Sequence, residues 1–339
     1  MVTRINPSLP ALWRDPKNMQ IGYGKKAVQL GNLSLSQEKL VAALFIGVAD
    51  SQFDLIAQQT GNSITESTEL LTALEKTLIR DRDRNFQLSP ELVSSMFAEI
   101  SRANLEHNQS GNQIVAMRAT RKIFINELTA SGLLAAQALA SCGIGQIFTG
   151  DRELVSKADL GPCGYPAQLL GKPRITATRD LLSASPNQTQ ISFNASVSEN
   201  VDAALLLGQE IVDPSSYQNF LSSDTPHAAL IFKQDGLWFS GLVRPGLTPC
   251  LNCYLSAQHD EDSAFPTLAS QLVNSKSRLD DTASRLFAAA IATRRLLQYL
   301  DSETTGATFE LGALQFNYST PEIEAFDWKF AHNCTCNFS

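Results

Sequence analysis

The sequence lacks the stretches that anchor or export a protein. No run approaches the roughly eighteen apolar residues that a membrane-spanning helix needs, and the first residues contain no apolar core of a signal peptide. Positive charge is also scarce, because 27 lysines and arginines stand against 34 aspartates and glutamates, which gives a formal net charge of −7. A basic face that would bind nucleic acid or an anionic membrane is therefore not expected. We predict a soluble, cytoplasmic protein with neither partner.

Cysteine is scarce too, but its placement is informative. Four of the six cysteines form two close pairs, Cys250 with Cys253 and Cys334 with Cys336. Cysteines separated by one or two residues seldom bridge each other well, whereas four thiolates complete the tetrahedral set of a structural zinc ion. We predict a structural zinc site that ties the last residues to a loop about eighty residues upstream. Two disulfides, or four ordinary buried thiols, are the alternatives.

Three other side chains are candidates for metal or nucleophilic chemistry. His332 lies two residues before Cys334 and is a possible fifth ligand, although a place beside the site or at the surface is the simpler expectation. Cys142 follows an apolar helical pattern and is expected in the core, and Cys163 lies in a loop rich in glycine and proline. Because no histidine is visibly paired with either thiol, neither is predicted to be a nucleophile.

Residues 1–98 show the pattern of a winged-helix-like α+β domain. Apolar pieces separated by turn residues predict an antiparallel meander over 11–13, 19–22 and 27–30. Three amphipathic helices are predicted between residues 36 and 78, followed by a returning strand at 85–88. A winged helix is typical of DNA-binding proteins. The third helix, however, carries three glutamates against one lysine, so a peptide is the better-matched ligand.

The second domain is predicted to cover residues 116–339, after a polar, aperiodic linker at 99–115. It begins with a βαβ unit, the arrangement of a dinucleotide-binding fold. The unit consists of strands 122–125 and 146–149 around a helix at 132–142. Strands are also predicted at 190–193, 203–207, 229–232, 237–240, 308–311 and 322–328, with a long helix at 281–300.

The phosphate loop of this βαβ unit lacks two of its glycines. A G-x-G-x-x-G pattern would place glycine at Glu127, Thr129 and Gly132, and only Gly132 is present. Glycine lets the backbone approach a polyphosphate, whereas a glutamate adds a like charge there. Nucleotide binding at this loop is therefore not expected. Asp151 follows the second strand, where a ribose-binding acid would stand, and it is equally suited to cap a turn.

Four groups of residues resemble the ThiF/MoeB superfamily of ubiquitin-activating-enzyme-like adenylyltransferases. They are the βαβ unit with Gly143-Ile144-Gly145 and Asp151, the segment Gly171-Lys172-Pro173-Arg174, which looks like the family's G-K-P-K, and the two cysteine pairs. The resemblance implies an α/β, Rossmann-like ThiF-type fold with a structural four-cysteine zinc site, preceded by the small winged-helix-like domain. Homodimers are common in the superfamily, so we expect one through the second domain.

Within the superfamily, the chain is similar to a bacterial branch in which a RiPP recognition element precedes the fold. That branch includes the leader-peptide-binding partners of YcaO cyclodehydratases in thiazole/oxazole (TOMM, bacteriocin) biosynthesis. The matching segments are 242–246, 250–253, 260–266 and 332–336. The resemblance implies that the chain binds a leader peptide and docks a YcaO-type enzyme.

Departures from the family pattern predict that catalysis is lost. An active member needs the glycine loop, a lysine in the G-K-P-K segment and an aspartate after the fourth strand. Here Arg174 stands at the lysine position, and Gly208-Gln209-Glu210 follows the strand. Arg174 could still hold a phosphate and Asp151 a ribose, but transition-state stabilisation depends on all these groups together. We predict a pseudo-enzyme without ATP and magnesium. The alternative is an active adenylyltransferase for the C-terminus of a small protein or peptide.

The peptide is expected to bind by strand addition at the edge of the meander. The predicted strand comprises Ala27, Val28, Gln29 and Leu30, and the predicted apolar wall comprises Leu70, Leu71 and Leu74. Leu70 and Leu74 are equally suited to the internal core of the domain.

Overall fold

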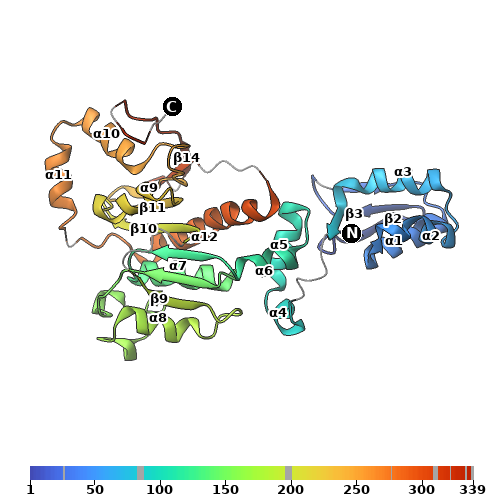
Figure 1. The fold of residues 1–339 in the computed structure, drawn as a ribbon, viewed down its shortest axis with the longest axis horizontal. Helices are drawn as coiled ribbons and strands as arrows, with labels where there is room; N and C mark the ends of the chain where they lie inside the picture. The colour runs from blue at the N-terminus through green and yellow to red at the C-terminus, as the bar shows by residue number, and fades with distance from the viewer. Residues whose placement is uncertain are drawn as a thin grey trace. The chain divides into compact units, whose positions relative to one another are not determined.

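The computed structural model describes residues 1–339 except 26, 82–87, 195–200, 276, 308–311, 321, 333 and 337–339. Two compact units divide the chain, Met1–Met117 (unit 1) and Arg118–Ser339 (unit 2) (Figure 1). Among the described residues, no helix combines the length and the apolar character that crossing a membrane requires.

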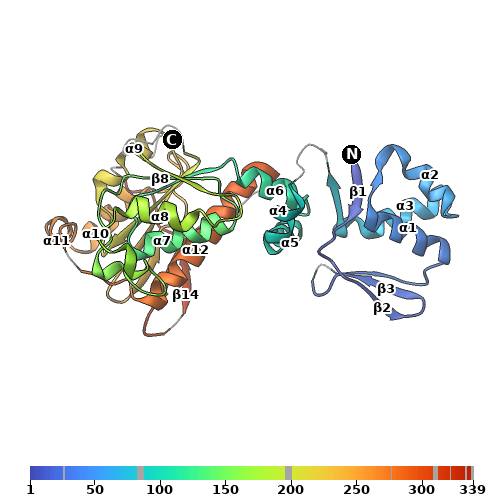
Figure 2. The ribbon, with the colours of Figure 1, turned by 90° about the horizontal axis from the view of Figure 1, so that it is seen from below.

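Unit 1 contains two small antiparallel sheets, a group of three helices that pack together, and three further helices that follow β6 (Leu78–Asp81) (Figure 2). Its strands are β1 (Val2–Ile5), β2 (Ala11–Asp15), β3 (Asn18–Ile21), β4 (Val28–Leu30), β5 (Val48–Ala49) and β6. Its helices are α1 (Leu35–Ile46), α2 (Phe53–Gln59), α3 (Ile64–Leu74), α4 (Pro90–Ser95), α5 (Phe97–His107) and α6 (Gly111–Arg118). The strand orders are β5-β1-β6 and β2-β3-β4. The predicted meander and three helices are confirmed. Residues 85–87 of the predicted returning strand lie outside the described residues.

The prediction of an aperiodic linker at 99–115 is wrong, because most of that segment is helical. Asn104 on α5 is 3% exposed, and its side-chain oxygen accepts the backbone N–H of Gly111 at 2.7 Å. Its side-chain amide donates to Ser8 Oγ at 3.1 Å, and its backbone carbonyl accepts from Asn6 Nδ2 at 2.9 Å. Polar side chains that suggest a solvated linker in the sequence are here the internal hydrogen-bonding partners of unit 1.

Unit 2 is built on one eight-stranded sheet of order β14-β13-β12-β11-β10-β7-β8-β9. Its strands are β7 (Lys122–Ile125), β8 (Gln146–Thr149), β9 (Gln190–Phe193), β10 (Ala203–Gln209), β11 (His227–Phe232), β12 (Gly236–Phe239), β13 (Ala313–Asn317) and β14 (Ile323–Phe326). Strands β7 to β11 pair in parallel, and β12 to β14 extend the sheet in antiparallel pairs. The predicted strand at 308–311 lies outside the described residues.

The two faces of this sheet are covered by different elements. The helices of unit 2 are α7 (Ala130–Ser141), α8 (Arg174–Leu182), α9 (Gln218–Ser222), α10 (Leu251–Glu261), α11 (Phe265–Leu272) and α12 (Thr282–Thr305). Alternate strand residues point to opposite faces, so Ile123 and Ile125 pack with α7 and α12. Phe124 and Leu206 pack on the other face with α9 and α10. Strand order reverses at β7 and β10, and ligands of such sheets bind beyond the carboxyl ends of the strands at that point.

Candidate functional site

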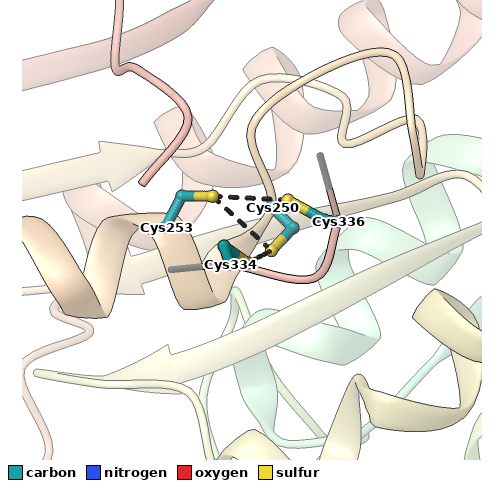
Figure 3. Close-up of side chains that lie close together, drawn as sticks. All are labelled: Cys250, Cys253, Cys334 and Cys336. Atoms are coloured by element: carbon teal, nitrogen blue, oxygen red, sulfur yellow. Dashed lines mark hydrogen bonds between the residues drawn. The ribbon is translucent and has the colours of Figure 1, made fainter. Parts of the chain in front are cut away.

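The four predicted zinc ligands come together on the α10 side of the sheet (Figure 3). Cys250 caps the N-terminus of α10 and Cys253 lies in its first turn, whereas Cys334 and Cys336 follow β14. The Sγ atoms of Cys250 and Cys334 are 3.4 Å apart, as are those of Cys253 and Cys336. All four sulfur atoms lie within 4.8 Å of one another.

This cluster is fit for a tetrahedral zinc ion. Four sulfur atoms at the usual zinc–sulfur distance would be about 3.8 Å apart, close to the observed 3.4–3.9 Å contacts. The cysteines are free thiols rather than two disulfides. Burial raises the pKa of Cys250, so a cation is needed to favour its thiolate, and the N-terminus of α10 adds favourable electrostatics. His332 is exposed and is not part of the cluster.

Aromatic side chains provide a second attachment of the C-terminal segment next to the cysteines. Trp328 makes edge contacts with Trp238 on β12 and Tyr254 on α10, with ring centroids 5.4 and 5.7 Å apart. The Trp238 and Tyr254 rings stack at 4.3 Å. Lys233 Nζ donates to the Tyr254 hydroxyl at 2.6 Å. We call these residues and the four cysteines the C-terminal clasp.

The predicted phosphate loop lies between β7 and α7, with Thr129 as the N-cap residue of α7. Glycine is required at Gly132 for packing, because a Cβ atom there would lie 1.9 Å from the Glu127 carbonyl oxygen. The Glu127 side chain is half-buried, and desolvation raises its pKa to about 7, against the opposing charge of Arg278. The loop therefore places a partly protonated carboxyl group where a nucleotide would bring phosphates.

Two carboxylates of the protein itself accept hydrogen bonds from the backbone of this loop. Asp151 Oδ2 accepts the Leu128 N–H at 2.6 Å, and Asp159 Oδ1 accepts the N–H of Ala130, the first residue of α7, at 3.3 Å. These N–H groups are the kind that hold phosphate in dinucleotide-binding folds. Asp151 is 6% exposed and Asp159 is fully buried.

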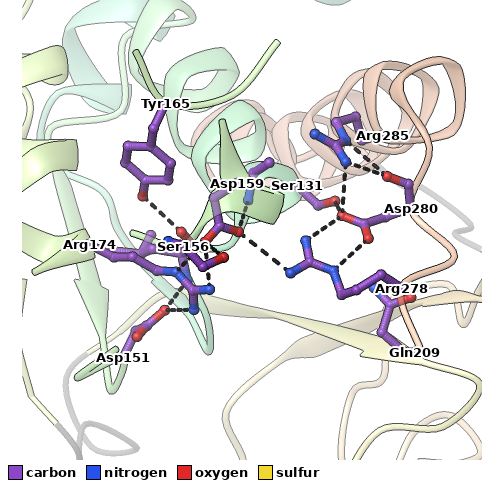
Figure 4. Close-up of polar contacts among 12 residues, drawn as sticks. Ser131, Asp151, Ser156, Asp159, Tyr165, Arg174, Gln209, Arg278, Asp280 and Arg285 are labelled. Carbon is purple, nitrogen blue, oxygen red and sulfur yellow. Dashed lines mark hydrogen bonds and ion pairs between the residues drawn. The ribbon is translucent and has the colours of Figure 1, made fainter. Parts of the chain in front are cut away.

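Arg174 connects the two carboxylates (Figure 4). Its Nη1 contacts Asp151 Oδ2 at 3.3 Å, and its Nε and Nη2 contact Asp159 Oδ2 at 3.2 and 2.8 Å. Hydrogen bonds from Ser156 and the nearby Arg174 guanidinium hold the pKa of Asp159 below its usual value despite burial. The two predicted nucleotide-binding residues, Asp151 and Arg174, thus lie together, but they bind each other and Asp159.

The network continues toward the start of α12. Arg278 lies 3.5 Å from Asp159 and 2.9 Å from Asp280. Asp280 also accepts from Ser131 Oγ at 2.6 Å and pairs with Arg285 at 3.6 Å. The sequence analysis missed these residues. Arg278, Asp280 and Arg285 are close in sequence, but no local motif marks their contacts with Asp159 and Ser131, which come from distant parts of the chain.

At the predicted peptide-binding site, β4 is an edge strand that pairs with β3 in the described part of unit 1. Gln29 is exposed, Ala27 and Val28 are half-buried, and Leu30 is buried. Leu70 and Leu74 belong to the internal core, with exposures of 5% and 0%, so they do not form an open wall. Leu71 is half-buried on α3, which contacts β4.

Together, the fold and the cysteine cluster define a class: an α/β E1-like fold preceded by a small α+β unit. Solved structures of E. coli MccB share this fold. The structure with ATP and the structure with AMPCPP and MccA each match with a TM-score of 0.68 and 14% identity, over 99% of this chain and 99% of that chain.

Two further solved structures share the fold. The microcin C7 biosynthetic enzyme MccB in complex with N-formylated MccA matches with a TM-score of 0.69 and 13% identity, over 99% of this chain and 100% of that chain. PaaA matches with a TM-score of 0.66 and 14% identity, over 95% and 99% of the two chains. No family model matches the chain, and no curated protein matches it in sequence. At these identities the likeness shows the fold alone.

Proposed function

We propose that this protein binds the leader segment of a precursor peptide through unit 1 and presents it to a modifying enzyme, such as a YcaO-type cyclodehydratase, without adenylating it. The observation that carries the proposal is the phosphate loop. Its Leu128 and Ala130 N–H groups are hydrogen-bonded to Asp151 and Asp159, and Arg174 is paired with both carboxylates. A nucleotide would have to displace a buried, charged network before it reached these groups.

The β4 edge supports the peptide-binding part of the proposal. An edge strand offers unpaired backbone donors and acceptors to an incoming strand. Beside it, Leu71 supplies apolar surface and Glu69 is exposed, whereas Glu66 accepts hydrogen bonds from Ser63 in the capping box of α3. A peptide with apolar anchors and a basic residue near Glu69 suits this surface. Peptide complexes of the same fold, MccB with MccA, are consistent with such a role.

A zinc ion at the cysteine cluster would have a structural role in this protein. Four sulfur ligands leave no position for water or substrate, so the ion would supply no Lewis acid chemistry. Cys250, Cys253, Cys334 and Cys336 would hold it and thereby fix the segment after β14 on α10.

Proline substitution at the strand edge tests the peptide site. Gln29→Pro removes a backbone donor at the free edge of β4, because the register of the sheet turns the Val28 N–H toward Ile21 on β3 and the Gln29 N–H away from β3. We expect it to weaken binding of the full chain to a fluorescently labelled leader peptide from the neighbouring genes by at least about tenfold, measured by anisotropy. Ala11→Pro on β2, the opposite edge strand of the same sheet, is the matched control, because the Ala11 N–H also faces away from β3. Equal binding by wild type and Gln29→Pro, or equal losses in both variants, would place recognition elsewhere.

A further inference from the structure

A cavity of about 630 Å³ lies in unit 2 at the end of the sheet where the parallel strands begin, that is, at their N-terminal ends. Ser240, the residue after β12, lies beside β11 through a hydrogen bond from its N–H to the Ala229 carbonyl. Asp151 and the phosphate loop lie at the other, C-terminal ends of the parallel strands, so the cavity is separate from them. Lining residues include Leu242, Arg244, Arg295, Leu314, Asp327 and Trp328.

Among the residues that the structure describes, the two arginines of this cavity have no carboxylate partner, whereas several other half-buried or buried arginines of unit 2 are paired with one. Paired examples are Arg118 with Asp301, Arg121 with Asp202, Arg174 with Asp159 and Arg285 with Asp280. The Arg244 and Arg295 guanidinium groups have neither an ion pair nor a hydrogen bond within the described ranges. Desolvation lowers the pKa of Arg295, and no carboxylate offsets that effect. Leaving two half-buried cations unpaired is costly unless an anion joins them.

The rest of the lining defines the chemistry of that anion. Two guanidinium groups and the Asp327 carboxylate leave one positive charge in excess, which matches a monoanion better than a phosphate dianion. Leu242, Leu314 and the Trp328 ring offer apolar surface next to the arginines. Arginine is well suited to a carboxylate because its planar fork makes paired hydrogen bonds.

We propose that this cavity binds the carboxylate of a ligand that also carries an apolar group, such as the C-terminal residue of a peptide. Arg244 and Arg295 hold the carboxylate, and the apolar side chain packs against Trp328 and Leu314. The site belongs to unit 2 alone. It does not depend on strand addition in unit 1, so failure of either proposal leaves the other standing.

Indole N–H resonances of the full-length protein test this site. The chain has three tryptophans, so three indole peaks are expected and can be assigned by Trp→Phe variants. We expect N-acetyl-L-leucine to shift the Trp328 peak in a saturable manner, while Trp13 in unit 1 stays unchanged as an internal control. N-acetyl-L-leucinamide, which has no carboxylate, and inorganic phosphate serve as comparison probes.

The variants identify the cation. Arg295→Gln should weaken N-acetyl-L-leucine binding by about tenfold or more, Arg295→Lys should weaken it less, and Arg80→Gln in unit 1 should have no effect. A Trp238 peak and a melting temperature equal to those of the wild type show that Arg295→Gln is folded. If the variant fails this check, Arg244→Gln replaces it. Equal shifts with the amide, tighter binding of phosphate, or no Trp328 shift at tens of millimolar probe would each overturn the proposal.

Discussion

Replacing Glu127 by glutamine should stabilise unit 2 at alkaline pH and leave its stability unchanged at acidic pH. Burial raises the pKa of this carboxyl group to about 7, from an unfolded value of 4.5. The folded state therefore binds the proton more tightly than the unfolded state, and stability is lost as pH rises from 4.5 through about 7. At pH 8.5 this rise in pKa corresponds to a loss of roughly 3 kcal/mol in the free energy of unfolding. Because the side chain is half-buried, we expect about 2 kcal/mol.

Urea unfolding at pH 5 and at pH 8.5 measures this difference. A Trp13→Phe background leaves the fluorescence of Trp238 and Trp328, which report on unit 2. Glutamine mimics the protonated side chain, so the variant and its parent should coincide at pH 5 and separate at pH 8.5. Glu153→Gln, at an exposed carboxylate, is the control and should show no pH-dependent gain. A gain of equal size at both pH values, or none at pH 8.5, would refute the argument.

Three further predictions concern metal, nucleotide and assembly. Protein prepared under reducing conditions should contain one zinc ion per chain by elemental analysis. Cys253→Ser should remove the ion and lower the melting temperature by about 10 °C, whereas Cys163→Ser should change neither quantity. Metal-free protein with the same melting temperature would exclude a zinc site. ATP with magnesium should give no heat of binding in titration calorimetry, and a micromolar constant would instead favour the adenylating alternative. Light scattering should report a homodimer of twice the 36.9 kDa chain mass, and a monomer at all concentrations would rule this out.

The central strands of the unit 2 sheet were largely predictable from sequence because they are buried on both faces, as in β10 and β11. Lys122–Ile125, Gln146–Thr149 and Gln190–Phe193 match the predicted bounds of β7, β8 and β9. Continuous apolar runs bounded by turn residues are the signature of such strands. The cysteine cluster was predictable for a different reason, since cysteines one or two residues apart seldom bridge each other and two such pairs suit a metal ion.

The network around Arg174 was not predictable in the same way. Its position in the G-K-P-K-like segment indicates a ligand-binding arginine, and Asp151 stands where a ribose acid would be. Only the folded chain places Asp159, fifteen residues before Arg174, between them. The same limit applies to Leu70 and Leu74. Their helical spacing shows that they lie on one face of α3, but only the packing of the folded chain shows that this face meets the core and not a ligand.

The C-terminal clasp also sets an order of events during synthesis. Cys250 and Cys334 are 84 residues apart, and Cys253 and Cys336 are 83 apart. Cys336 is synthesised after the parallel strands and α10. The site at Cys250 and Cys253 therefore stays incomplete until Cys334 and Cys336 have left the ribosome. Contacts that span so much chain form late, and a metal ion would bind only at that final step. The supply of zinc to a growing cell would then limit how fast unit 2 is completed, not how fast it begins to fold.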